Sequence, residues 1–143
     1  MDKDAVASRF RVILILWASL LGGVTFFTGG VLALTTGTVG AWTPTLDPGL
    51  AAKLMVLPTL SMAAGIVFRR GEVKRAGDAE ARLGALQVQV IVGAAMQEGG
   101  GLFGLVLCLL AGQPTWALGV WAITAVAMGI TRPSRDEVDA LLR

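Results

Sequence analysis

The residue with the clearest chemical potential is Glu98, an acid inside a long apolar segment. No other Asp, Glu, Lys or Arg lies between Leu83 and Thr131. A carboxylate at the centre of a membrane helix costs about 2.5–3.5 kcal/mol on insertion scales. We therefore expect Glu98 to be protonated or held by hydrogen bonds. An ionisable group at such a depth is a functional candidate by default.

Two glutamines accompany this acid on the same predicted helix. Gln87 precedes Glu98 by eleven residues, almost three helical turns, and so shares its face. Gln97 faces a neighbouring stripe of glycines. A carboxyl group, amide side chains and backbone exposed by glycine can together hold a proton or a partly dehydrated Na⁺. Glu98, Gln87 and Gln97 are the predicted ion-binding residues, and the alternative is a neutral acid that hydrogen-bonds across a helix interface.

The composition excludes several other chemistries. The chain has no histidine and no tyrosine, so imidazole acid–base catalysis and imidazole metal sites are excluded. Its single cysteine, Cys108, lies in an apolar run and has no intrachain partner for a disulfide. No phosphate-binding loop or nucleophile elbow is present. We predict no catalytic residues, no metal, no cofactor and no nucleic-acid binding, and thus no enzyme.

Hydropathy predicts a single all-α membrane domain. Of the 143 residues, 55 % are hydrophobic and 15 % charged, against about a quarter charged in soluble domains. Uncharged apolar runs of 18 or more residues indicate bilayer spans. We expect a compact, glycine-rich bundle of four transmembrane helices at about 12–34, 48–68, 83–111 and 116–130.

Local signals mark where these helices begin and end. Asp47 can cap the second helix, with Pro48 in its first position, and Asp78 can cap the third. Lys53 lies near enough to the end of the second helix to snorkel. The linker 69–82 follows this helix, which Arg69, Arg70 and Gly71 end.

The positive charge predicts the orientation. Eleven of the twelve Lys and Arg residues lie in the N-terminal segment, the linker 69–82 or the tail 132–143, and only Lys53 falls on the other side. We expect the chain to lie in a bacterial inner (plasma) membrane. The positive-inside rule then predicts that both termini are cytoplasmic. In the tail, Ser134 and Glu137 have capping-box spacing, which predicts a short surface helix. Its apolar face would comprise Val138, Leu141 and Leu142.

Glycines recur at helical spacing in the first and third predicted helices. Small residues let membrane helices approach closely, because the bilayer supplies little hydrophobic drive between them. The glycines either pack inside the bundle or form a face for another subunit, which leaves a homo-oligomer or a larger membrane complex open. The predicted helix-packing residues are Gly22, Gly23, Gly29, Gly30, Gly93, Gly100, Gly101 and Gly104.

The segment Val92–Gly112, VGAAMQEGGGLFGLVLCLLAG, resembles the ion-carrying helix of the rotary-ATPase proteolipid, the c subunit. The match consists of a Gly, an Ala, the acid and an aromatic-Gly-Leu-Val run, at Gly93, Ala95, Glu98, Phe103, Gly104, Leu105 and Val106. The resemblance implies that Glu98 is an ion-binding carboxylate. It also implies a hairpin of the second and third helices around a cytoplasmic loop.

Two functions follow as hypotheses. In the first, the chain is a small membrane subunit that binds or conducts H⁺ or Na⁺ through Glu98. In the second, it is a non-catalytic accessory or assembly subunit of a larger membrane complex, and Glu98 is a structural hydrogen-bonding group. An intramembrane enzyme has little support, because one acid without a nucleophile or metal site supplies too few parts.

Overall fold

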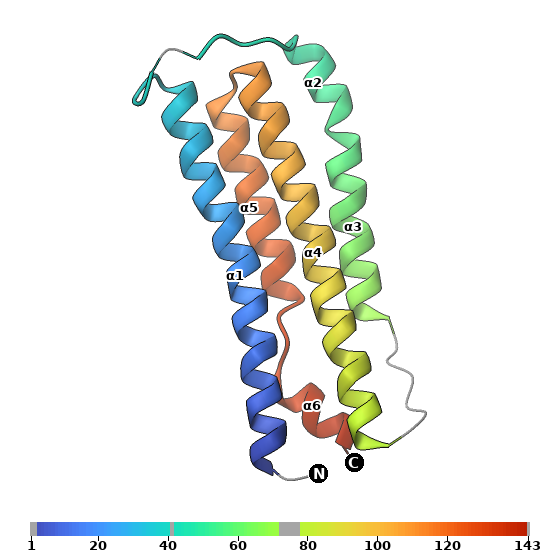
Figure 1. Cartoon of the computed structure of the whole chain (residues 1–143). Coiled ribbons are helices and arrows are strands. Elements are labelled where there is room, and N and C mark those ends of the chain that lie inside the picture. Colours follow the sequence, from blue (N-terminus) through green and yellow to red (C-terminus); the bar gives the residue numbers. More distant parts are fainter. Residues whose placement is uncertain (1–2, 41, 72–77, 143) are drawn as a thin grey trace.

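The computed structural model describes residues 3–40, 42–71 and 78–142, with the side chains of 3, 141 and 142 left out. These residues form six α-helices and no strands. Four segments are long and apolar enough to cross a membrane: Asp4–Thr35, Pro48–Arg70, Ala79–Ala111 and Pro114–Ala140. The chain is thus a multi-pass membrane protein. Both chain ends lie at one end of the bundle (Figure 1), here called the termini end, and the opposite end is the loop end.

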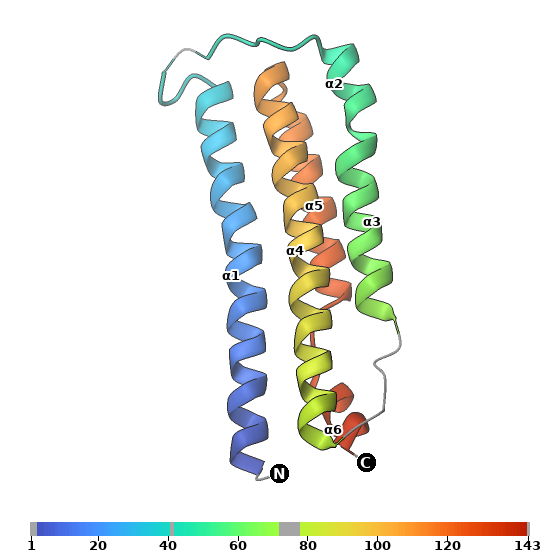
Figure 2. The same ribbon diagram turned by 45° about the vertical axis from the view of Figure 1, so that its right-hand side comes forward.

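Helix α4 (Ala79–Ala111) is the centre of the bundle. It contacts α1 (Lys3–Thr35), α3 (Val56–Arg70) and α5 (Pro114–Ile130), and its contact with α3 is the most extensive. Helices α3 and α5 barely touch each other. After a 45° turn α1 and α3 lie on either side of α4, with α5 behind it (Figure 2). Most of the contacts that hold the bundle together therefore involve α4, although α1 also packs against α5.

Helix α1 begins at Lys3, so the expected start near residue 12 is wrong. The polar segment before residue 12 continues the helix because its apolar residues have a partner. Phe10 and Ile13 are buried against Leu83 and Leu86 of α4. At about 1.5 Å per residue, a helix of 33 residues is longer than a hydrocarbon core of about 30 Å, so part of α1 extends beyond the apolar layer.

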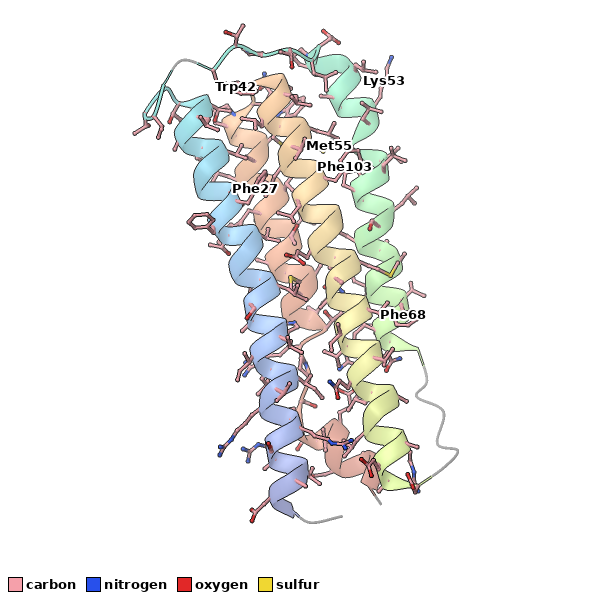
Figure 3. All side chains as sticks on the ribbon, viewed as in Figure 1. Phe27, Trp42, Lys53, Met55, Phe68 and Phe103 are labelled. Carbon is pink, nitrogen blue, oxygen red and sulfur yellow. The ribbon has the colours of Figure 1, made fainter. Side chains whose placement is uncertain are left out.

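The predicted second helix is divided into α2 (Pro48–Leu54) and α3 by a turn at Met55. Pro58 explains the division, because it has no N–H to donate to the carbonyl of Leu54. The predicted start is confirmed: the Asp47 carboxylate accepts a hydrogen bond from the Leu50 N–H at 2.9 Å, and Pro48 is the first helical residue. Lys53 lies at the loop end (Figure 3).

Both ends of α4 follow local rules. Asp78 caps its start by accepting from the Ala81 N–H at 2.8 Å, although the helix begins at Ala79 and not near residue 83. Gly112 ends it in the left-handed conformation with φ +62°, where glycine is favoured. The loop then covers this end: the Trp42 Nε1–H donates to the Leu109 carbonyl at 2.8 Å. The last carbonyls of α4 are satisfied in this way.

The tail folds back as α6 (Arg135–Leu142), a short helix at the termini end. The Ser134 hydroxyl accepts from the Glu137 N–H at 3.2 Å, so the predicted cap is formed. Val138 is buried in the same apolar cluster as Phe10 and Leu86. The two leucines of the predicted apolar face, Leu141 and Leu142, lie outside the described side chains. The linker residues 72–77 are also outside the described part of the chain.

Candidate functional site

Glu98 lies where α4 meets α1. A Cβ placed on Gly23 of α1 would be 3.1 Å from the Glu98 Oε1 atom, so the carboxyl group rests directly on the α1 backbone. Glycine at this position leaves the space that the carboxyl group occupies. Among the described residues, none forms a hydrogen bond or an ion pair with the Glu98 side chain. The acid is therefore placed by packing alone.

The carboxyl group lies at the edge of the α1–α4 contact rather than inside it. Ala94 and Leu105 on one side of Glu98 are buried, whereas Ala95 and Gly99 on the other side are exposed, and Glu98 itself is partly exposed. In a bilayer, such an exposed edge is open either to lipid or to a neighbouring protein. A carboxyl group there without a hydrogen-bond partner carries much of the insertion cost of an intramembrane acid.

Gln97 points to the other side of α4. The side chain is 0 % exposed, and its Oε1 accepts from the Thr131 hydroxyl at 3.1 Å at the end of α5. Its Cγ would be 2.9 Å from a Cβ on Gly65 of α3, so it fills the space between α3, α4 and α5. The Gln97 Nε2 has no partner among the described residues. Adjacent helical residues are turned by about 100°, which explains the separation from Glu98.

Gln87 is partly buried on the face of α4 that also carries Glu98. Eleven residues place it about 16 Å farther along the helix axis. Metal–oxygen bonds in proteins are about 2.0–2.6 Å long, so these two side chains cannot share one ion. The structure does not bring the three predicted ion ligands together, and in its described part no group of three acidic, His or Cys residues could hold a metal. Ion binding at Glu98 stays a prediction.

The two glycine stripes differ in their surroundings. On α4, a Cβ at Gly100 would be 2.7 Å from the Pro58 carbonyl oxygen and one at Gly101 would be 2.7 Å from the Thr124 hydroxyl. Gly93 and Gly104 are similarly close to α3 and α5. On α1, a Cβ would meet nothing within 4 Å at Gly22, Gly29 or Gly30. The α4 stripe is filled by the bundle, and the α1 stripe is open.

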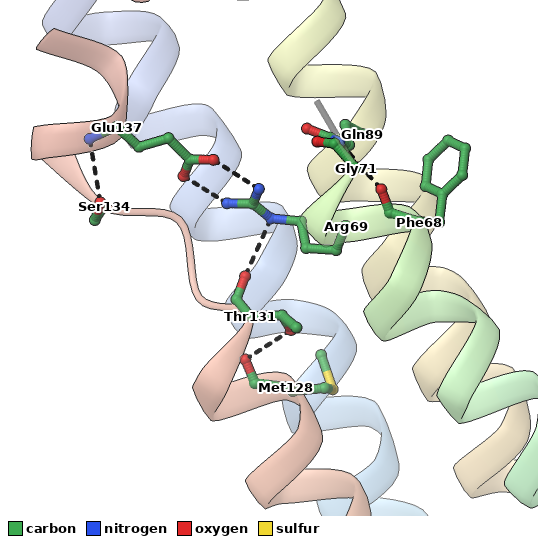
Figure 4. A network of polar contacts seen from close by, with 8 residues as sticks. All are labelled: Phe68, Arg69, Gly71, Gln89, Met128, Thr131, Ser134 and Glu137. Atoms are coloured by element: carbon green, nitrogen blue, oxygen red, sulfur yellow. Dashed lines mark hydrogen bonds and ion pairs between the residues drawn. The ribbon is translucent and has the colours of Figure 1, made fainter. Parts of the chain in front are cut away.

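A polar network at the termini end was not predicted (Figure 4). Arg69 is only 7 % exposed and its guanidinium donates to both Glu137 oxygens, at 2.7 and 2.6 Å. Its Nε–H donates to the Thr131 carbonyl at 3.2 Å. In a full capping box the Glu137 carboxylate would accept a hydrogen bond from the Ser134 N–H, but here it accepts from Arg69. The partners are 68 residues apart, so no local pattern could have found the pair.

Gln89 belongs to the same region. Its Nε2 donates to the Phe68 carbonyl at 3.1 Å and also to the Gly71 carbonyl, which satisfies the end of α3 (Figure 4). Its Oε1 is buried without a partner in the described part of the chain. The termini end of the bundle is therefore held by side chains that bond across helices, whereas Glu98 has no such bond.

Comparisons with known proteins add no relative. No protein-family model, no curated protein and no solved structure matches this chain. The likeness of α4 to a proteolipid helix therefore stays a prediction from the sequence of Val92–Gly112. A function for the chain has to be proposed from the geometry of the helix bundle.

Proposed function

We propose that the chain is a non-catalytic subunit of a larger assembly in a bacterial inner membrane, and that it meets its partner through the face around Glu98. The observation that carries the proposal is the position of this acid at the open edge of the α1–α4 contact, without a partner in the described part of its own chain. A partner helix that accepts a hydrogen bond from the protonated carboxyl group removes the cost of leaving it in lipid.

The open glycines of α1 support the same face. Gly22, Gly29 and Gly30 leave the backbone uncovered, and spacings of seven and eight residues place them along one side of a helix. Close helix approach at small residues is a main source of association in membranes. The adjacent Phe26 is 87 % exposed and adds apolar contact area. Phe26 is one turn from Gly23, which contacts Glu98, so the open face of α1 lies next to the acid.

The charge distribution supports the orientation that this proposal includes. Eleven of the twelve Lys and Arg residues belong to the two terminal segments and the linker 69–82, and both termini lie at the same end of the bundle (Figure 1). The proposal therefore has both termini in the cytoplasm, the side that the positive-inside rule favours for such basic segments. Lys53, at the loop end, is then on the opposite side of the membrane.

Purification in a mild detergent tests the interface. The wild type is expected in an assembly, either a homo-oligomer or a defined complex with co-purifying proteins. Gly29→Leu should release the monomer, because the added side chain separates the two helices, and should leave the unfolding midpoint of the monomer unchanged. Ala63→Leu, at an exposed position of α3, is the matched control and should keep the assembly. A wild type that is monomeric and alone, in both detergent and lipid nanodiscs, would refute the proposal.

A second candidate is proton uptake and release at Glu98. The partly exposed carboxyl group, without a cation beside it in the described residues, favours this function over Na⁺ binding. A proton needs only the carboxyl group, whereas Na⁺ needs several oxygen ligands, and Gln97 faces elsewhere. The resemblance of α4 to a proteolipid helix implies the same chemistry.

Carbodiimide labelling separates the two functions. If Glu98 carries protons, dicyclohexylcarbodiimide should label it in folded protein, and Glu98→Gln should abolish both labelling and any proton flux in liposomes while the assembly persists. Suppression of labelling by sodium would indicate that the ion is Na⁺. A folded sample that is not labelled at any pH excludes ion chemistry at this residue. The interface proposal instead predicts that Glu98→Gln is tolerated and that Glu98→Leu weakens the assembly.

A further inference from the structure

A basic cavity of about 270 Å³ opens at the termini end between α3, α5 and α6. Its lining includes three arginines, Arg69, Arg70 and Arg132, and one acid, Glu137. We call it the arginine pocket. Arg69 and Arg70 are the last residues of α3, and Arg132 follows the end of α5. The pocket is therefore located where two spans reach the membrane surface.

Most of the positive charge in the arginine pocket is uncompensated. Glu137 is already bound by both terminal nitrogens of Arg69. The side chains of Arg70 and Arg132 are exposed and have no ion pair within the described part of the chain. Guanidinium groups bind phosphate oxygens in a bidentate geometry. The described lining residues thus give the pocket the chemistry of a phosphate site, with a net charge of +2 from three arginines and one glutamate.

The arginine pocket continues into an apolar groove between α3 and α5. A cavity of about 370 Å³ follows it and shares Ile130 with it; a third, of about 430 Å³, shares Ile123 with the second. The groove exists because α3 and α5 barely touch. Its side chains include Ile66 and Val126 in the middle and Met55 and Trp116 near the loop end. Figure 3 shows Met55, one of these residues, toward the loop end.

The length of the groove fits an acyl chain. Ile130 and Trp116 are fourteen residues apart on α5, about 21 Å at 1.5 Å per residue. One leaflet of a hydrocarbon core of about 30 Å is about 15 Å deep. An acyl chain that enters the groove next to the arginine pocket can therefore stay inside the groove through the full depth of its leaflet. The charged pocket and the apolar groove match the two parts of one amphipathic ligand.

We propose that this composite site binds one anionic phospholipid from the leaflet at the termini end, with its phosphate in the arginine pocket and an acyl chain in the groove. Basic pockets between transmembrane helices are suited to anionic head groups. A zwitterionic lipid fits less well, because its cationic group would need a free carboxylate. Among the described residues that line the pocket, the one carboxylate is engaged by Arg69. The proposal does not depend on the role of Glu98.

Native mass spectrometry of the purified chain tests the site with three probes. Dioleoylphosphatidylglycerol should bind with a stoichiometry of one, dioleoylphosphatidylethanolamine more weakly, and inorganic phosphate not measurably. The double variant Arg70→Gln/Arg132→Gln should weaken the phosphatidylglycerol complex about 25-fold, at roughly fivefold for each basic residue near a membrane surface. The matched control Arg11→Gln/Arg135→Gln removes the same charge from exposed positions outside the pocket and should change binding less than twofold.

A second variant tests the groove separately from the charge. Ala122→Trp fills the groove between α3 and α5 and should weaken phosphatidylglycerol binding, whereas Ala18→Trp, exposed on α1, should not. Equal affinity for the two lipids would overturn the proposal. Tight binding of inorganic phosphate with no effect of Ala122→Trp would show an anion site only. A copurified protein that these lipids do not displace and that Ala122→Trp releases would show that a protein helix, and not a lipid, occupies the groove.

Discussion

Helices α1 and α4 have the same length of 33 residues and similar glycine spacing, yet they have opposite surroundings. Half of the residues in an 18-residue apolar stretch of α4 are buried, against 17 % in the corresponding stretch of α1. From Gly93 to Gly104, a Cβ added at any glycine of α4 except Gly99 would have a neighbouring atom within 4 Å. On α1, a Cβ added at three of the four glycines would have none. A glycine stripe therefore indicates that a face can accept a close neighbour, but it does not identify the neighbour.

The same contrast holds for two adjacent polar residues. Gln97 points to the centre of the bundle and bonds to Thr131, whereas Glu98 points to its edge and rests on Gly23. A turn of about 100° separates a structural amide from an acid that is open to a partner. The side of α4 that carries Gln97 should thus determine the stability of the monomer. The edge of α4 that carries Glu98, next to α1, should determine whether the monomer binds a partner in the membrane.

The largest expected effect is that of Gly100→Leu. A Cβ at this position would be 2.7 Å from the Pro58 carbonyl oxygen, a backbone atom that cannot move without α3. We expect destabilisation of about 3 kcal/mol or more, measured by SDS-induced unfolding in mixed micelles. Gly29→Leu, with nothing within 4 Å, is the matched change on α1 and should leave the monomer midpoint unchanged. Equal losses in both variants would contradict the distinction between the two stripes.

Gly93→Ala should have a smaller effect. The added Cβ would be 2.8 Å from the Arg69 Cβ and 3.1 Å from the Gly65 carbonyl oxygen, so α3 must shift slightly. The expected loss is about 1–3 kcal/mol in the same unfolding assay. Gly22→Ala is the control on α1 and should cost nothing, because its surroundings are empty. A greater loss for Gly22→Ala than for Gly93→Ala would mean that α1 packs more tightly than α4.

Thr131→Val tests the buried amide on the inner side of α4. The variant removes the hydroxyl group that donates to Gln97 Oε1, and the Gln97 Nε2 already lacks a partner among the described residues. An unsatisfied buried polar group costs about 1–3 kcal/mol. Thr59→Val, exposed on α3 and bonded to the carbonyl of the turn residue Met55 just before this helix, should cost much less. If Gln97→Leu/Thr131→Val does not recover stability, the hydrogen bond is not the source of the loss.

The smallest expected effect is that of Gly23→Ala. Its Cβ would be 3.1 Å from the Glu98 Oε1, the far end of a flexible side chain that can turn toward the open edge. We expect a stability loss below about 1 kcal/mol and a clear change in the rate of carbodiimide labelling at Glu98, if that residue is labelled at all. A loss as large as that of Gly93→Ala would show that the α1 contact is as rigid as the α3 contact.

The sequence by itself determined the apolar spans and most of their ends. Asp47, Asp78 and Ser134 cap the helices that they were predicted to cap, because a cap involves only residues three positions apart. Runs without charge locate the spans for a similar reason, since transfer into lipid is a property of each segment. The division at Met55 also has a local cause in Pro58, although the sequence pattern predicted one continuous helix over 48–68.

Only the tertiary structure decided which side of each helix faces the centre. The extension of α1 down to Lys3 depends on apolar residues of α4 that cover Phe10. The bonds from Arg69 to Glu137 and from Thr131 to Gln97 join residues 68 and 34 positions apart. Such pairs form only after the helices have packed against one another. The spacing of apolar residues along one helix does not specify which helix packs against it. The open position of Glu98 has the same origin: α4 turns its other sides toward α3 and α5, and α1 covers only part of the side that carries the acid.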